Sequence, residues 1–172
     1  MKKIFNLSIL IFFINLPLAS SEIFYIDIER LINFSEPGKY INDKITNLNK
    51  VSDEKYNKIR DNLKEKEKLL ISQKNILNTK EFNLKLSELQ KEVKKFNIEN
   101  NQRLKNQQQK SLNYKRKLIQ EMEPILIDYM KENNISYLFR KQNILIGRED
   151  LNKTEAIMLL VNSKINKELF DD

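Results

Sequence analysis

Only two glycines, Gly38 and Gly147, occur in this chain, and residues 39–123 contain neither glycine nor proline. A compact protein of 172 residues normally uses about 7% glycine, much of it in turns. With so few residues suited to tight reversals, long uninterrupted helices are the first expectation. The length corresponds to one ordinary domain.

The composition excludes several kinds of active site. The chain has no cysteine and no histidine, which rules out thiol nucleophiles, histidine acid–base catalysis and zinc sites built from these residues. Two distant glycines cannot form a glycine-rich phosphate loop. We therefore expect a protein that is not an enzyme and that uses no cofactor or metal ion.

The first residues have the pattern of an export signal. Two lysines precede an apolar run over residues 4–14, and small residues follow, with Ala19 and Ser21 at cleavage-site spacing. The run is shorter than the roughly 20 residues of a membrane-spanning helix. The pattern predicts a signal peptide over residues 1–21, cleaved between Ser21 and Glu22, with an uncleaved anchor as the alternative.

The segment after the cleavage site predicts a strand and two helix starts. Residues 23–26 are β-branched and aromatic, which is typical of a strand. Asp27 is placed to cap a short helix, and Ser35 to cap the next one. Pro37 is tolerated in the first turn of that helix, where Gly38 would permit close backbone packing.

Two long helical runs follow, and they predict an antiparallel hairpin. Apolar residues recur at helical spacing over residues 40–78, enough for a helix of roughly 60 Å. After a break near Thr79, a second run has the 4-3-4-3 spacing of a coiled-coil seam. Its residues are Phe82, Leu86, Leu89, Val93 and Phe96. We expect Tyr56, Phe82 and Phe96 to pack inside this hairpin rather than to contact a partner.

The same seam becomes polar after Phe96, in the part of the second helix that leads back to the body. The next seam positions are Asn100, Arg103, Gln107 and Ser111, and apolar residues resume at Tyr114. Such a shaft buries little apolar area, so we expect it to be loosely packed and able to bend. Pro124 then predicts a kink in the returning helix, with a hinge as the sharper alternative.

The remaining residues predict a hairpin of strands and a last helix. Residues 137–140 and 144–146 have strand character and are separated by three polar residues. Asn152 and Glu155 have the spacing of a capping box. The chain thus divides into an arm, residues 37–120, and a body, residues 22–36 and 121–172. The expected body core contains Ile23, Tyr25, Leu138, Ile144 and Ile146.

Charge is divided unequally between these parts. The arm holds 21 Lys and Arg against 10 Asp and Glu, a net charge of +11, whereas the body carries −6. Residues 101–120 contain six cations and no acid, which makes them a candidate basic face for an anionic partner. These cations are Arg103, Lys105, Lys110, Lys115, Arg116 and Lys117. A solvated helix face is the alternative interpretation.

Taken together, these motifs resemble the Skp/OmpH family of periplasmic chaperones over essentially the whole chain after residue 21. The resemblance rests on their order along the chain: residues 23–27 with Arg30 and Leu31, the trio Ser35, Gly38 and Lys39, then residues 124–126, 137–139, 143–146 and 150–152. The resemblance implies structural or hinge roles for four residues, namely Ser35, Gly38, Lys39 and Pro124. The arm departs from the family by its many Asn, Gln and Lys residues, so no client-binding residue is carried over.

The resemblance implies a fold and a function. The fold is α+β and mostly α: strands from three chains close a small body, and three arms hang from it around a cavity, like a jellyfish. The implied activity is ATP-independent holding of unfolded outer-membrane proteins in the periplasm by a homotrimer. Anionic lipid or lipopolysaccharide is a further implied partner, and no nucleic acid is expected. An exported coiled-coil scaffold of the envelope and a basic nucleic-acid-binding helical protein are the alternatives.

Overall fold

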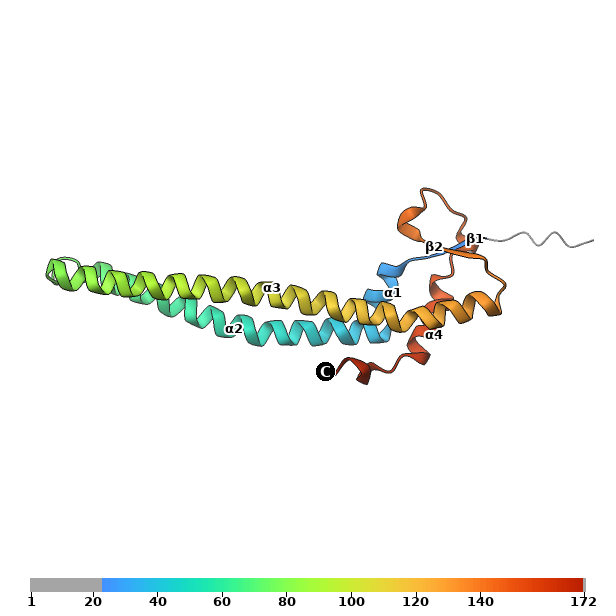
Figure 1. The fold of residues 1–172 in the computed structure, drawn as a ribbon, viewed down its shortest axis with the longest axis horizontal. Coiled ribbons are helices and arrows are strands. Elements are labelled where there is room, and N and C mark those ends of the chain that lie inside the picture. Colours follow the sequence, from blue (N-terminus) through green and yellow to red (C-terminus); the bar gives the residue numbers. More distant parts are fainter. Residues whose placement is uncertain (1–22, 172) are drawn as a thin grey trace, which may run out of the picture.

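The structure is a computed structural model that describes residues 23–171, so the predicted signal peptide lies outside the described residues. Two long helices lie side by side as a hairpin, and the short elements gather at one end of it (Figure 1). The expected mostly helical α+β class is confirmed. In chain order the elements are β1 (Ile23–Ile26), α1 (Ile28–Phe34), α2 (Glu36–Ser72), α3 (Thr79–Glu132), β2 (Tyr137–Arg140), η1 (Lys141–Asn143), η2 (Glu149–Leu151), α4 (Thr154–Lys164) and η3 (Lys167–Phe170).

Helices α1 and α2 begin where their capping residues predict. The Asp27 carboxylate accepts a hydrogen bond from the backbone N–H of Arg30 at 2.9 Å. The Ser35 hydroxyl accepts one from the N–H of Gly38 at 3.1 Å, and Ser35 is fully buried. Each cap satisfies a backbone donor that the first helical turn leaves without a partner.

The hairpin turns earlier than the spacing predicts. The first long helix was expected to extend through Asn78, but α2 ends at Ser72. The side chain of Asn78 instead caps α3 by accepting from the N–H of Glu81 at 2.9 Å. Because this cap starts the returning helix at Thr79, residues 73–77 are left to reverse the chain. In this reversal the backbone N–H groups of Ile76 and Leu77 both donate hydrogen bonds to the carbonyl oxygen of Gln73.

The strands of the small sheet pair differently from the expectation. β1 and β2 pair in parallel, with Ile23 opposite Tyr137 and Ile26 opposite Arg140. The predicted hairpin between residues 137–140 and 144–146 is wrong for this chain, because η1 follows β2 directly and residues 144–146 form no strand. A bridge between Tyr25 and Asn152 occupies the other side of β1.

The last helix differs from the expectation at its start. α4 begins at Thr154, and Glu155 forms an ion pair with Arg30 at 2.8 Å instead of completing a capping box. The side chain of Asn152 accepts hydrogen bonds from both the N–H and the hydroxyl of Thr154. The same Thr154 hydroxyl oxygen accepts from the N–H of Asp27 at 2.8 Å. The beginning of α4 is therefore bound to the end of β1.

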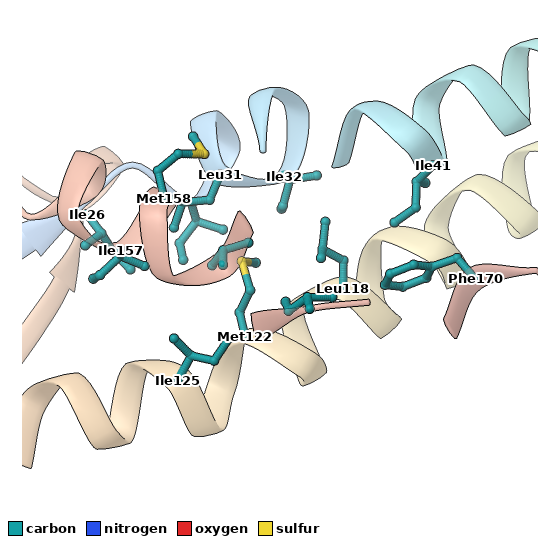
Figure 2. Close-up of a cluster of buried hydrophobic side chains, with 13 residues drawn as sticks. Ile26, Leu31, Ile32, Ile41, Leu118, Met122, Ile125, Ile157, Met158 and Phe170 are labelled. Atoms are coloured by element: carbon teal, nitrogen blue, oxygen red, sulfur yellow. The ribbon is translucent and has the colours of Figure 1, made fainter. Parts of the chain in front are cut away.

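One buried cluster holds the body to the hairpin (Figure 2). It draws side chains from β1, α1, α2, α3, α4 and η3, including two from the base of the arm, Ile41 and Leu118. Its fully buried members are Leu31, Leu118, Met122, Ile157, Val161 and Phe170. Ile157 and Val161 lie about one helical turn apart in α4 and both belong to this cluster.

The five residues expected in the body core have different environments in the single chain. Tyr25 is buried, and Leu138 packs partly buried against the cluster. Ile144 is half-buried. Ile23 and Ile146 are exposed in the single chain, at 51% and 91%, so their place in a core stays a prediction for the assembled body. Ile23 opens an edge strand and Ile146 lies outside any strand, so no second layer within residues 23–171 covers them.

Candidate functional site

The hairpin starts at an unusually close contact between α1 and α2. Gly38 is buried, and a Cβ added to it would lie 2.1 Å from the carbonyl oxygen of Ile32. Only a residue without a side chain fits so close to a backbone oxygen. The expected role of Gly38 in close backbone packing is therefore confirmed, and neighbouring Lys39 is exposed. The arm thus leaves the body where the backbones of α1 and α2 are in close contact.

The outer half of the hairpin packs along its predicted apolar seam. Leu63 and Leu70 of α2 are buried. The rings of Tyr56 and Phe96 contact each other with centroids 6.0 Å apart, so these aromatics pack within the hairpin as expected. An open groove of about 360 Å³ remains beside this seam. Its apolar lining residues are Leu70, Ile71, Phe82, Leu86, Leu89 and Val93.

Arg103 is an internal residue of the inner shaft rather than a surface cation. Its guanidinium lies over the ring of Tyr56, 4.7 Å from the centroid, and forms an ion pair with Asp53 across the hairpin. Its Nε also donates to Asn100 at 3.0 Å. Only 14% of the Arg103 side chain is exposed. Arg103 therefore connects α2 to α3 at a position where a coiled coil normally has an apolar residue.

The two helices enclose a groove at this polar part of the seam. The groove has a volume of about 730 Å³, and Ile45, Leu48, Tyr56, Ile98 and Tyr114 supply its apolar walls. Polar seam residues Arg103 and Gln107 and the rim residues Lys55 and Lys110 also line it. The loose packing expected for the inner shaft is thus seen as open space between α2 and α3.

The six cations of residues 101–120 do not form one face. Lys105, Lys110 and Arg116 are exposed, and Lys115 is half-buried. Arg103 lies in the seam, as described above. Lys117 donates a hydrogen bond to the carbonyl oxygen of Leu169 and lies 5.7 Å from the ring centroid of Phe170. Within residues 101–120, the positive charge accessible to a partner is therefore carried mainly by the three exposed cations.

Pro124 lies within α3, and the helix continues through it from Thr79 to Glu132. Just beyond the end of the helix, Asn134 adopts a left-handed backbone conformation with φ 53°. Asparagine tolerates this conformation, and a left-handed residue commonly follows the end of a helix. The bend and the hinge role of Pro124 stay predictions.

Sequence reasoning missed the residues that join the arm to the end of the chain. Tyr40 and Lys44 of α2 both contact residues 170–171. The signal that could have found this contact is Phe170, an aromatic residue among charged ones near the C-terminal end. Its 3₁₀ turn is too short to give a periodic pattern.

Gln107→Leu is expected to stabilise the arm by about 1 kcal/mol. Gln107 occupies a seam position, and its Nε2 is buried without a hydrogen-bond partner among the described residues. Leucine removes that unsatisfied donor and adds apolar contact across the seam. Urea unfolding and hydrogen exchange of residues 100–114 measure the change. Gln108→Leu, at the exposed neighbouring position, is the control and should shift stability by less than about 0.5 kcal/mol. Equal effects of the two variants would contradict the buried polar seam.

The fold first defines a class: an α+β protein in which a small body carries a long helical hairpin. The chain belongs to the family described as outer membrane protein (OmpH-like), whose family model matches residues 22–159. The family resemblance of the sequence motifs is thereby confirmed. No curated protein sequence matches the chain.

A solved structure has the same fold. It is a candidate outer membrane chaperone (OmpH-like) from Caulobacter crescentus CB15, with a TM-score of 0.74 and 14% sequence identity. The match covers 83% of this chain and 85% of the other. Within residues 23–171, no helix is long and apolar enough to cross a membrane. The same residues contain no group of three or more His, Cys, Asp or Glu side chains placed to hold a metal ion.

Proposed function

We propose that this protein is an ATP-independent holdase chaperone of the periplasm, which binds unfolded outer-membrane proteins between helical arms and prevents their aggregation. The observation that carries the proposal is the arm itself, a hairpin of a 37-residue and a 54-residue helix with open, largely apolar grooves along its seam. Family membership and a neighbour described as a candidate chaperone support it. The predicted signal peptide supports the periplasmic location.

The body supports assembly into a homotrimer. A two-stranded sheet is marginal by itself, and no neighbouring strand in the described residues covers the outer edge of β2. Large apolar side chains are exposed around this sheet and in the loop that follows it. They are Ile23, Tyr137, Phe139, Leu145 and Ile146. Copies of the same chain that cover these residues would complete the body and set three arms around one cavity.

The arm has the chemistry that such clients need. Unfolded barrel proteins expose alternating apolar residues and unpaired strand edges, which aggregate in water. The grooves offer apolar walls, and Lys110 adds exposed positive charge at the inner groove. Lys105 and Arg116 are further exposed cations of the same helix. Many weak contacts of this kind allow release without a nucleotide, so the proposed function needs no catalytic residue or cofactor. The same cations suit anionic lipid or lipopolysaccharide, and no nucleic-acid partner is proposed.

The proposal predicts that the purified protein keeps an unfolded outer-membrane barrel protein soluble when that client is diluted from urea. We expect light scattering to stay near its starting value at a several-fold molar excess of trimer. Higher salt should weaken the protection partly, because the electrostatic contribution of the arm is screened. Client aggregation at the same rate as in buffer alone would overturn the proposal. Capture of one stoichiometric partner, in place of many unrelated barrel proteins, would favour the scaffold alternative.

A further inference from the structure

We propose that residues 165–171 form a clasp that fixes the base of the arm to the body and limits how far the arm swings. The clasp contains the short turn η3, which follows α4 and returns along the base of the hairpin (Figure 1). It lies beyond residues 22–159, the part that matches the family model. It is therefore a feature of this chain beyond the matched segment.

An apolar anchor holds the clasp in place. Phe170 is fully buried, although charged residues surround it in the sequence. Its ring points toward Leu118 of α3, and both belong to the same buried cluster as Ile41 of α2 (Figure 2). Ile165, at the other end of the clasp, is buried in this cluster as well. One side chain of the clasp thus packs between the two helices of the arm.

Polar contacts from both arm helices surround this anchor. From α2, Lys44 donates to the carbonyl oxygen of Phe170, and the Tyr40 hydroxyl donates to the Asp171 carboxylate. From α3, Lys117 donates to the carbonyl oxygen of Leu169. At the opposite end of the clasp, Lys167 forms an ion pair with Glu36 at 2.9 Å. The clasp therefore binds α2 and α3 together where they leave the body.

The charges of the clasp are suited to neutral pH. The hydrogen bond from Tyr40, with Lys44 nearby, lowers the pKa of Asp171 below its ordinary value of 3.8. The ion pair with Lys167 similarly lowers the pKa of Glu36. A lowered carboxyl pKa means that the stabilising contact persists above the ordinary value and is lost only as the pH falls through the folded-state pKa. The clasp should thus remain closed at neutral and mildly acidic pH.

Removing the anchor should free the arm. The chain has no native cysteine, so cysteines introduced at Asn75, near the tip, and Ser163, in α4, can carry two spin labels without competition. Labelled chain is diluted with unlabelled chain, so that only distances within one chain are measured. We expect Phe170→Ala to broaden the tip-to-body distance distribution at least twofold. Leu169→Ala is the matched control, because its side chain is exposed while its carbonyl group remains.

Two outcomes would overturn the clasp. One is an unchanged distribution in a Phe170→Ala protein that keeps its helical circular dichroism. If Phe170→Ala does not fold, Asp171→Ala decides, because Asp171 is exposed and lies outside the buried cluster. A broader distribution in Asp171→Ala supports the clasp, and an unchanged one overturns it. These distances do not depend on the proposed function. If the unsubstituted protein protects no client while Phe170→Ala broadens the tip-to-body distance distribution, the holdase is refuted and the clasp is supported.

Discussion

Gly38→Ala is expected to destabilise the folded chain by about 3 kcal/mol, although alanine ordinarily stabilises a helix relative to glycine by about 1 kcal/mol. The added Cβ would lie 2.1 Å from the carbonyl oxygen and 2.8 Å from the carbonyl carbon of Ile32. Both are backbone atoms, so relief requires α1 and α2 to move apart. That movement would disturb the buried Ser35 cap and the packing of Ile41.

Urea unfolding followed by helical circular dichroism measures this effect. A loss of about 3 kcal/mol corresponds to a fall in Tm of roughly 6–12 °C for a chain of this size. Asn47→Ala, at an exposed position in the interior of the same helix, is the control and should be neutral or slightly stabilising, because only helix propensity changes. If Gly38→Ala proves as stable as Asn47→Ala, the close contact between α1 and α2 is not present in solution.

Ile146→Asp is expected to convert the proposed trimer into single chains at micromolar concentration. In the single chain Ile146 is 91% exposed, so a charge there costs the isolated fold almost nothing. In a trimer that covers this loop, the aspartate would be buried without a partner, which is strongly unfavourable. The variant should also lose most of its protection of a urea-diluted client, because one arm alone encloses no cavity.

Light scattering coupled to size-exclusion chromatography gives the mass that decides this prediction. Ile76→Asp is the matched control, because Ile76 is also an isoleucine exposed by 81% but lies at the tip of the hairpin. It should keep the mass of three chains. A three-chain mass for Ile146→Asp would show that this loop lies outside the interface, and a one-chain mass for the unsubstituted protein would refute the trimer.

Local signals predicted the helices well because their causes are local. Asp27 and Ser35 cap their helices through side chains that bond backbone groups three residues away. The seam that begins at Phe82 follows the helical repeat, and the residues at its positions are generally less exposed than their neighbours. The spacing also predicted that the seam becomes polar and loosely packed, and the groove beside Gln107 is the result.

Predictions failed where the partner of a residue is distant in sequence. In the sequence Arg103 is one of six similar cations. In the structure it lies in the seam, where it contacts Asp53 and Tyr56 of the opposite helix. Residues 144–146 have strand character, but strand character alone does not choose a pairing partner. β2 pairs with β1 from the other end of the chain, and η1 follows β2 directly, so residues 144–146 do not return along the free edge of β2.

The sequence by itself determined a long helical hairpin, the capped starts of its helices, a positively charged arm and a body without thiol or imidazole chemistry. These properties depend on composition, on spacing and on contacts within about one helical turn. Only the tertiary structure decided that β1 pairs in parallel with β2, that Arg103 faces inward and that Phe170 holds the base of the arm. Each of these depends on burial between segments brought together from separate parts of the chain, which no local pattern records.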